Sequence, residues 1–199
     1  MLLNPAVCIY PQFIPLAREF LMNTNIAVAT VVNFPKGQDS LTDVLADLYL
    51  AQRAGANEID VVLNYQASSH DIQIFLAACR SASPKPIKLK VILETGALTT
   101  KQIAEFSQFA IDADVDFLKT STGKIPIGAT LEAAEIMLKA IRDSGKKVGF
   151  KASGGIRQVD QAMAYAKLAE DIMGKGWVSP KTFRLGASGL LDEIINSLC

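Results

Sequence analysis

Short apolar runs alternate with longer amphipathic stretches along the chain, and this pattern predicts strands and helices in turn. Helical spacing of apolar residues is clearest after Ser40, Thr100 and Thr130, which we expect to be N-caps, and from about Gln158 to Met173. The short apolar runs predict seven buried strands, which are Ala6–Ile9, Ile26–Val32, Glu58–Leu63, Lys88–Leu93, Phe117–Thr120, Val148–Lys151 and Phe183–Leu185.

Strict alternation of strands and helices indicates an α/β fold with a parallel sheet covered by helices. The units are roughly 25–35 residues long, as expected of βα repeats. A TIM-type (β/α)8 barrel fits better than an open doubly wound sheet, because polar and glycine residues follow almost every strand. A barrel places its active site at those strand ends, whereas an open sheet would gather such residues mainly at one crevice.

The number of elements is too small for a complete barrel. We find seven strands and about seven helices, so the prediction is a barrel of seven βα units in which the first strand and helix are missing. No linker divides the chain, and residues 1–199 are expected to form a single domain. Such a barrel would have two unpaired edges and a partly exposed core.

Composition and charge narrow the class of protein. Half of the 199 residues are hydrophobic, and Lys+Arg and Asp+Glu both number 20. Bulk charge therefore gives no reason to expect a nucleic-acid or membrane-surface partner, and no uncharged run is long enough to span a bilayer. Three widely spaced cysteines form no metal-ligand or disulfide pattern, which fits the cytoplasm. His70 lies in a polar stretch and is expected to be a surface loop residue.

Two lysines end apolar strand patterns. They are Lys119 and Lys151, and lysine is among the residues least often fully buried. Two nearby ammonium groups repel, which lowers the pKa of at least one and produces a nucleophilic amine. The alternatives are an ion pair of Lys119 with Asp116 or Asp114, and a Lys151 that extends out of the barrel mouth. Lys124, in the following loop, fits equally a phosphate contact, a charge near Lys119, or a surface residue.

A carboxylate lies within the third predicted strand. If Val61 and Leu63 face the helices, the residues that alternate with them face the barrel axis. Those residues are Asp60, Val62 and Asn64. A carboxylate inside a barrel needs a cationic partner or a catalytic task, and the two lysines favour a cluster at one mouth. The alternative is an exposed Asp60, with Glu58 merely beginning the strand.

Glycines follow the last two strands. Gly154 and Gly155 follow one of them, and Gly186, Ser188 and Gly189 follow the other. Loops after barrel strands 7 and 8 commonly bind phosphate through backbone N–H groups and a helix N-terminus, and glycine lets the anion approach closely. The alternative is that both segments are simply tight βα turns.

On these residues the chain resembles the deoxyribose-phosphate aldolases, which are class I aldolases with a (β/α)8 barrel. The matching segments appear in the family's order, cover essentially the whole chain, and include two highly specific lysine motifs. They are Val7–Pro11, Ala29–Pro35, Glu58–Val62, Lys90–Gly96, Phe117–Lys124, Gly149–Arg157 and Phe183–Ser188.

The resemblance implies reversible cleavage of 2-deoxy-D-ribose 5-phosphate to D-glyceraldehyde 3-phosphate and acetaldehyde, with no metal and no other cofactor. It implies that Lys119 forms the Schiff base. Lys151 would lower the pKa of Lys119 and join a proton relay, with Asp60 as the acid/base partner. Cys8 matches a family cysteine near the site, where an exposed thiol would react with unsaturated aldehydes.

The resemblance also implies which residues bind the substrate. The expected phosphate ligands are Gly154, Gly155, Gly186 and Ser188, and the expected lining residues of the substrate pocket are Gly123 and Lys124. The partners would be a small sugar phosphate and an aldehyde, and a homodimer is consistent with the open edge of the barrel.

The chain departs from the family pattern at its two ends. The family's first strand and the helix after it have no counterpart, and no tail ending in tyrosine follows Cys199. A start further upstream, a neighbouring subunit that covers the gap, or a degraded copy would each explain the missing unit. The competing hypotheses are therefore a truncated, non-catalytic or weakly active homologue that keeps phosphate binding or subunit contacts, and a Schiff-base aldolase for another sugar phosphate. The two lysine motifs disfavour the latter.

Overall fold

The structure, a computed structural model, describes residues 6–187 and 189. These residues form one parallel sheet in which each strand pairs with the next along the chain, in the order β1 to β7. The seven strands are β1 (Ala6–Ile9), β2 (Ala27–Val32), β3 (Glu58–Val62), β4 (Lys88–Ile92), β5 (Phe117–Lys119), β6 (Gly149–Ser153) and β7 (Phe183–Gly186). All seven predicted strands are confirmed, with small shifts at their ends.

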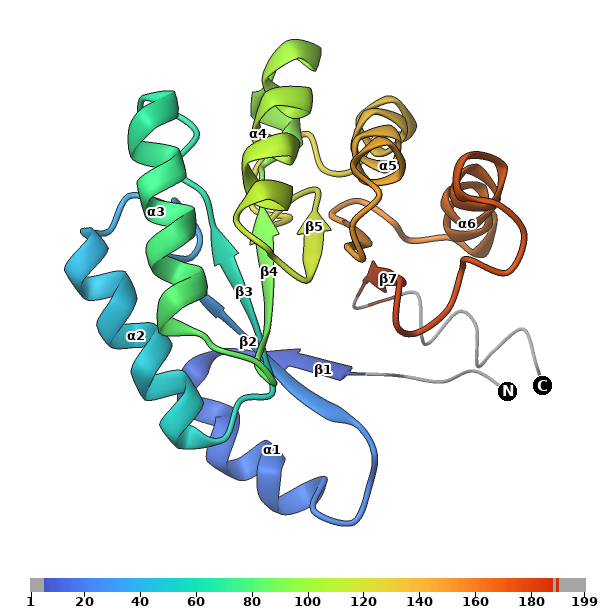
Figure 1. The fold of residues 1–199 in the computed structure, drawn as a ribbon. Coiled ribbons are helices and arrows are strands. Elements are labelled where there is room, and N and C mark those ends of the chain that lie inside the picture. The colour runs from blue at the N-terminus through green and yellow to red at the C-terminus, as the bar shows by residue number, and fades with distance from the viewer. Residues whose placement is uncertain (1–5, 188, 190–199) are drawn as a thin grey trace.

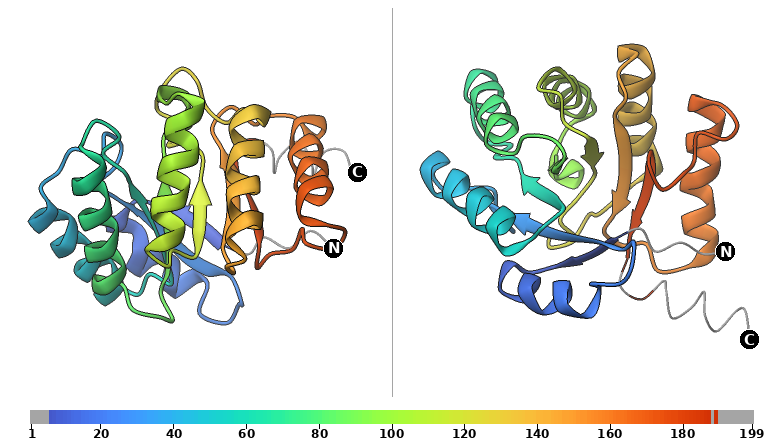
Figure 2. Two further views of the ribbon diagram at one scale, coloured as in Figure 1. Left: turned by 45° about the horizontal axis from the view of Figure 1, so that its top comes forward. Right: turned by 60° about the horizontal axis from the view of Figure 1, so that its bottom comes forward.

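The sheet is curled, and the helices cover its outer side (Figures 1 and 2). The helices are α1 (Ile14–Phe20), α2 (Leu41–Ala54), α3 (Ser69–Ala82), α4 (Thr100–Asp112), α5 (Leu131–Ser144) and α6 (Val159–Met173), with short 3-10 turns η1 (Pro11–Phe13) and η2 (Thr95–Ala97). Within the described residues β1 and β7 are edge strands that do not pair with each other. This is a TIM-type arrangement of seven strands, as predicted; the helix expected after the last strand lies outside the described residues.

The N-caps set where the helices begin. Ser40 and Thr130 cap α2 and α5 as predicted, because each side chain accepts a hydrogen bond from the N–H three residues on. The cap of α4 is Thr99 and not Thr100. Thr99 accepts from the Gln102 N–H, and the Gln102 side chain accepts from the Thr99 N–H in return. This capping box favours the earlier threonine.

The expectation that His70 lies in a loop is wrong. His70 is in the first turn of α3, where it is exposed. The helix begins there because the Ser68 hydroxyl accepts from the Asp71 N–H and because Ile72, Leu76 and Cys79 recur at helical spacing on its buried face. Among the described residues, no helix has both the length and the apolar character needed to cross a bilayer.

Alternation along the strands separates two buried layers. Val61 and Leu63 belong to the large apolar cluster between the sheet and the helices. Asp60, which lies between Ile59 and Val61, is fully buried on the other side of the sheet, so the predicted alternation is confirmed. Asn64 lies after the last residue of β3 and is only half-buried, so the alternation of the strand does not extend to it.

Candidate active site

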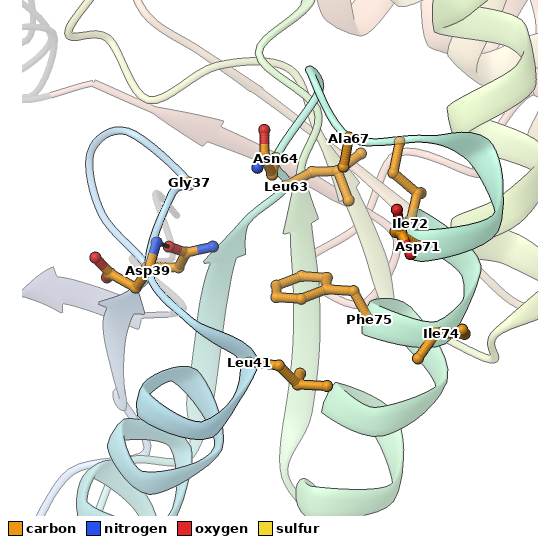
Figure 3. A pocket seen from close by; sticks show the side chains of 11 residues that line it. Gly37, Asp39, Leu41, Leu63, Asn64, Ala67, Asp71, Ile72, Ile74 and Phe75 are labelled. Atoms are coloured by element: carbon orange, nitrogen blue, oxygen red, sulfur yellow. Dashed lines mark hydrogen bonds between the residues drawn. The ribbon is translucent and has the colours of Figure 1, made fainter.

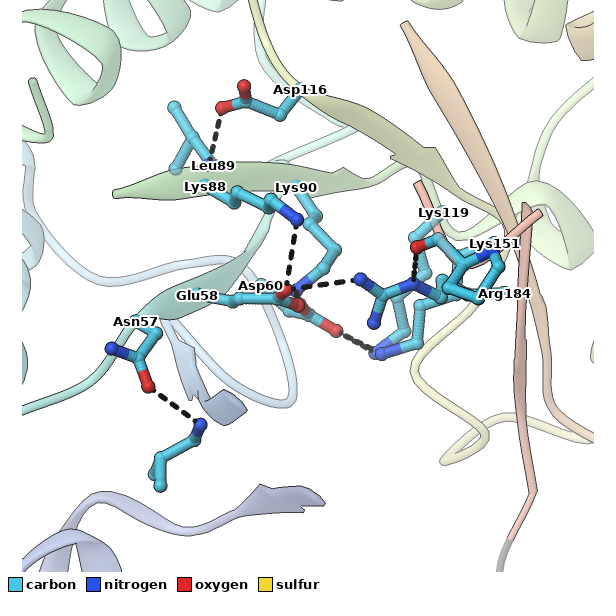
Figure 4. A network of polar contacts seen from close by, with 12 residues as sticks. Asn57, Glu58, Asp60, Lys88, Leu89, Lys90, Asp116, Lys119, Lys151 and Arg184 are labelled. Atoms are coloured by element: carbon cyan, nitrogen blue, oxygen red, sulfur yellow. Dashed lines mark hydrogen bonds and ion pairs between the residues drawn. The ribbon is translucent and has the colours of Figure 1, made fainter. Parts of the chain in front are cut away.

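The register of β5 and β6 brings the two lysines together. Lys119 lies directly opposite Lys151 across the pair of strands, and both side chains project to the inner side of the sheet. Each Nζ reaches the same carboxylate oxygen, Oδ2 of Asp60, at 2.8 Å from Lys119 and 2.7 Å from Lys151 (Figure 4). Lys119 is 6% exposed, Lys151 is 8% exposed and Asp60 is completely buried, so the cluster lies inside the sheet.

These contacts decide between the alternatives raised by the sequence. The carboxylate of Asp116 pairs with Arg80, and that of Asp114 pairs with Lys85 on the surface. Lys119 is bound by Asp60 instead. The side chain of Lys151 turns inward to the same carboxylate, so it does not extend out of the barrel mouth.

A third lysine completes the coordination of Asp60. Lys90 lies opposite Asp60 in the register of β3 and β4, and its Nζ is 2.7 Å from Oδ1 of Asp60. The same ammonium group is 2.8 Å from Oε2 of Glu58, which is itself buried. Glu58 in turn accepts a hydrogen bond from Arg184 of β7 at 3.2 Å. Glu58 therefore does more than begin a strand: its carboxylate connects Lys90 of β4 to Arg184 of β7 (Figure 4).

Basic groups outnumber carboxylates in this network. Four buried cationic side chains, from Lys90, Lys119, Lys151 and Arg184, share two carboxylates. Charges are costly to bury unless they are paired, so a network with excess positive charge favours the loss of a proton from one of its ammonium groups.

The pKa shifts show which lysine releases its proton most readily. Burial lowers the pKa of Lys119 below its ordinary value; the Asp60 carboxylate opposes this effect and the charge of Lys151 adds to it. Burial, the largest single effect, disfavours the charge of Lys151, but the carboxylate of Asp60 together with other nearby groups, including Glu58, holds the pKa of Lys151 above its ordinary value. Burial alone would raise the pKa of Asp60, yet Lys119, Lys151 and Lys90 hold it well below its usual range. The site thus contains a weakly basic amine beside a persistent ammonium–carboxylate pair.

Sequence reasoning missed Lys90, Glu58 and Arg184 as members of the cluster. Glu58 is two residues before Asp60, and Lys90 is two residues before Ile92, in strands whose alternate residues face the helices. The period-2 rule that was applied to Asp60 therefore also places these side chains on the inner side. The alternation of Glu58 and Lys90 was therefore present in the sequence, but their contacts with each other and with Arg184 depend on how β3, β4 and β7 are placed in the fold.

Lys90 is expected to be important for stability. Replacing it with methionine removes the ammonium group between two buried carboxylates, and we expect a loss of about 3 kcal/mol in the free energy of unfolding, measured by urea denaturation. Lys88→Met is the matched control, because Lys88 is on the same strand, is 40% exposed and lies 3.5 Å from Glu58. It should cost less than about 1 kcal/mol. Equal losses in the two variants would contradict this account of Lys90.

The predicted phosphate-binding glycines lie at the ends of β6 and β7. Gly154 and Gly155 have φ angles of +90° and +82°, a conformation that strongly favours glycine. A methyl group on Gly186 would lie 2.7 Å from Cβ of Ser153 and 3.1 Å from Cε of Lys151, so this glycine leaves room for the second lysine. Gly186 is the last residue of β7, and Ser188 lies outside the described residues.

The other predicted site residues lie on the open side of the cluster. Gly123 and Lys124 are exposed in the loop after β5, and Gly123 has a φ angle of +74°. Gly123 lies against Gly154, since a methyl group on Gly123 would be 3.6 Å from its Cα. Cys8 is exposed on β1 and lies within electrostatic range of both site lysines.

A separate hollow of about 220 Å³ lies between the loop after β2 and the start of α3 (Figure 3). Its walls include Leu41, Leu63 and Phe75, with Asn64 and Asp39 among the polar lining residues. The hollow does not include the lysine cluster, and it lies on the helix side of the sheet, where Leu63 belongs to the outer apolar cluster.

A curled parallel βα sheet with paired lysines at its inner carboxyl edge defines the class of TIM-type lysine aldolases. The model of the DeoC/LacD family aldolases matches residues 4–190, and the chain belongs to this family.

Individual relatives agree with this assignment. Over 199 residues the chain is 49% identical to a deoxyribose-phosphate aldolase of Agrobacterium fabrum, an alignment that covers 97% of this chain and 77% of the relative. A solved structure from Coccidioides immitis, provisionally named a deoxyribose-phosphate aldolase, superposes with a TM-score of 0.84 at 31% identity, covering 98% of this chain and 73% of that one. A further solved structure, named QR15, an aldolase, gives a TM-score of 0.80 at 28% identity, with 98% and 83% covered.

Proposed function

We propose that the protein is a class I aldolase that reversibly cleaves 2-deoxy-D-ribose 5-phosphate to D-glyceraldehyde 3-phosphate and acetaldehyde. The observation that supports this most directly is the contact of Lys119 and Lys151 with one oxygen of Asp60. The similarity to the deoxyribose-phosphate aldolase of Agrobacterium fabrum supports the choice of substrate.

Lys119 is the proposed nucleophile. Its lowered pKa increases the fraction of free amine, which attacks the aldehyde carbon of the open-chain sugar. Loss of water gives a protonated imine at C1, which accepts the electrons of the bond between C2 and C3. That bond breaks when a base removes the proton of the C3 hydroxyl, so glyceraldehyde 3-phosphate leaves and an enamine stays on Lys119. Protonation of the enamine carbon and addition of water release acetaldehyde and restore the amine.

Lys151 and Asp60 are the proposed proton-transfer groups. Lys151 keeps its proton because of Asp60, and it is therefore placed to donate to a leaving hydroxide or to the enamine carbon. The Asp60 carboxylate holds both Nζ atoms in place and stabilises the positive charge that the imine requires. Asp60 is also the proposed acceptor of the C3 hydroxyl proton, which it passes to Lys151 for delivery to the enamine carbon. Each proton therefore has a donor and an acceptor among these residues, and neither task calls for a metal or another cofactor.

The phosphate is proposed to bind at the glycine-rich ends of β6 and β7. Gly154, Gly155 and Gly186 leave the backbone accessible to an anion, and Ser188 is assigned to the same group from sequence alone. Gly123 and Lys124 would line the pocket between the phosphate and Lys119. These residues come from three consecutive βα loops, which converge at the carboxyl edge of the sheet.

The test of the proposed function is formation of D-glyceraldehyde 3-phosphate from 2-deoxyribose 5-phosphate by the purified chain. We expect turnover that survives chelators. The competing hypothesis of a non-catalytic homologue predicts thermal stabilisation by the sugar phosphate without product. Turnover of another sugar phosphate at a higher kcat/KM would instead support the Schiff-base aldolase with a different substrate.

A homodimer in the cytoplasm is also proposed. The sequence basis for the compartment is the unpatterned set of cysteines. Exposed apolar side chains on and beside α1, including Leu16, Phe20 and Met22, support self-association next to the edge strand β1. Light scattering that finds a stable monomer at all concentrations would reject the dimer.

A further inference from the structure

A buried carboxylate outside the lysine cluster lies at the end of β4. Glu94 is 2% exposed, and its φ and ψ angles of 61° and 53° place it in the left-handed region, which a non-glycine residue seldom adopts. Such conformations are costly and are found most often at functional sites. Among the described residues Glu94 makes no ion pair, although the lysine cluster and its neighbours contain four buried cations. A carboxylate buried without a cation requires compensating hydrogen bonds.

Within the described residues, the side-chain hydrogen bonds of Glu94 are all with Thr122. The Thr122 N–H donates to Oε1 of Glu94 at 3.2 Å, and the Thr122 hydroxyl donates to Oε2. The hydroxyl oxygen of Thr122 accepts from the Lys124 N–H at 3.0 Å. Glu94 therefore fixes the orientation of Thr122, and Thr122 fixes the start of the turn that contains Gly123 and Lys124.

This turn belongs to the segment 120–130, here called the post-lysine loop, which is attached to the ends of two strands. On the β4 side, the Thr95 N–H donates to the Thr120 carbonyl at 2.9 Å. On the β6 side, the Ser153 hydroxyl donates to the Ser121 carbonyl and the Ala129 N–H donates to the Gly154 carbonyl. Among the described residues outside the loop, Glu94 is the one whose side chain hydrogen-bonds to Thr122, next to the exposed Gly123 and Lys124.

We propose that Glu94 is a positioning residue that sets the post-lysine loop for the phosphate-bearing half of the substrate. This inference rests on the proposed function. Acetaldehyde needs the lysine cluster alone, because it has no hydroxyl or phosphate for the loop to contact. The sugar phosphate and glyceraldehyde 3-phosphate extend past the loop toward Gly154 and Gly155, so their binding depends on where Thr122 and Gly123 lie.

The test is a comparison of Glu94→Gln with the unaltered protein. Glutamine keeps the size of the side chain but has one neutral acceptor oxygen in place of two charged ones. One Thr122 donor therefore loses its acceptor, and the other keeps only a neutral acceptor. We expect the KM for 2-deoxyribose 5-phosphate and the Kd for glyceraldehyde 3-phosphate, the latter by calorimetry, to rise about tenfold. Imine trapping with acetaldehyde and borohydride should change less than about twofold, because the lysine cluster is untouched.

Two further variants separate positioning from a general loss of structure. Glu105→Gln is the matched control, since half-buried Glu105 on α4 also accepts a hydrogen bond from a hydroxyl, that of Ser69 at 3.0 Å, and its replacement should leave KM unchanged. Thr122→Val removes the hydroxyl that Glu94 holds, and we expect the double variant with Glu94→Gln to bind little worse than either single one.

The outcomes distinguish a failure of the Glu94 proposal from a failure of the proposed aldolase function. A normal Kd in Glu94→Gln, or a parallel fall in acetaldehyde trapping, would overturn the role of Glu94. Absence of acetaldehyde trapping in the unaltered protein would count against the proposed function. In that case, a tenfold weaker Kd in Glu94→Gln would still support Glu94 as a positioning residue for a phosphate ligand.

Discussion

Lys119→Leu is expected to cleave 2-deoxyribose 5-phosphate at least about 10⁴-fold more slowly than the unaltered protein. The reason is chemical, because no imine forms without the amine. The fold should persist, since Asp60 keeps its contacts with Lys90 and Lys151 and the network loses one of its excess positive charges. A coupled assay for glyceraldehyde 3-phosphate measures the rate, and circular dichroism measures the fold.

Lys139→Leu is the control for this loss. Lys139 is half exposed on α5, and its ammonium group pairs with Glu135 on the same helix and not with a member of the cluster. Its replacement should leave turnover within about twofold, as surface substitutions generally do. Retention of more than about one per cent of the activity in a folded Lys119→Leu variant would show that Lys119 is not the nucleophile.

Lys151→Leu is expected to slow imine formation by at least about tenfold near neutral pH while leaving it nearly normal at high pH. The sign follows from the charges. The ammonium group of Lys151 helps to lower the pKa of Lys119, after burial itself. Without it, the pKa of Lys119 rises, less free amine is present at pH 7, and the acid limb of the rate profile moves to higher pH.

The measurement is the rate of acetaldehyde trapping as a function of pH. In the unaltered protein the midpoint of the acid limb should lie below the ordinary lysine pKa of about 10.4, and in Lys151→Leu it should lie closer to that value. An unchanged midpoint would remove the tuning role from Lys151. A uniform loss of rate at every pH would point to proton transfer as its main task.

The sequence predicted the parts of the site that depend on one strand at a time. Lys119 and Lys151 stood out because each ends an apolar run, and Asp60 stood out because period-2 alternation turned it inward. The contact of both lysines with one oxygen of Asp60 depends on the register of three strands. No local pattern specifies that register, so the residues favoured a carboxylate–lysine cluster at one mouth of the barrel but could not predict which atoms would meet.

The residues that sequence analysis missed or misplaced also depend on contacts that a local pattern does not specify. Lys90 and Arg184 were not recognised, although alternation could have turned both inward. A single inward lysine or arginine has no evident partner in the sequence, and only the fold brings both side chains into contact with Glu58. His70 was placed in a loop because its neighbours are polar. The Ser68 cap and the buried face of α3 begin the helix one residue before it. Glu94 was part of a matching segment, but its conformation and its contact with Thr122 are tertiary features.

Because the described sheet has seven strands, the position of the site relative to the edge strands matters. Lys119 and Lys151 lie on β5 and β6, with Asp60 on β3, whereas the edge strands of the described part of the chain are β1 and β7. Consecutive pairing from β2 to β7 therefore gives each of the three strands that carry the proposed catalytic side chains a neighbour on both sides. Arg184, from the edge strand β7, reaches the cluster through Glu58, and this contact connects the edge to the site.

The most direct test is to incubate the protein with acetaldehyde and borohydride and to map the modified peptide by mass spectrometry. The account predicts one reduced adduct, on Lys119, that forms readily near neutral pH and is absent from Lys119→Leu. An adduct on Lys151 or Lys90, or no adduct in a folded protein, would contradict the assignment of Lys119 as the imine-forming lysine.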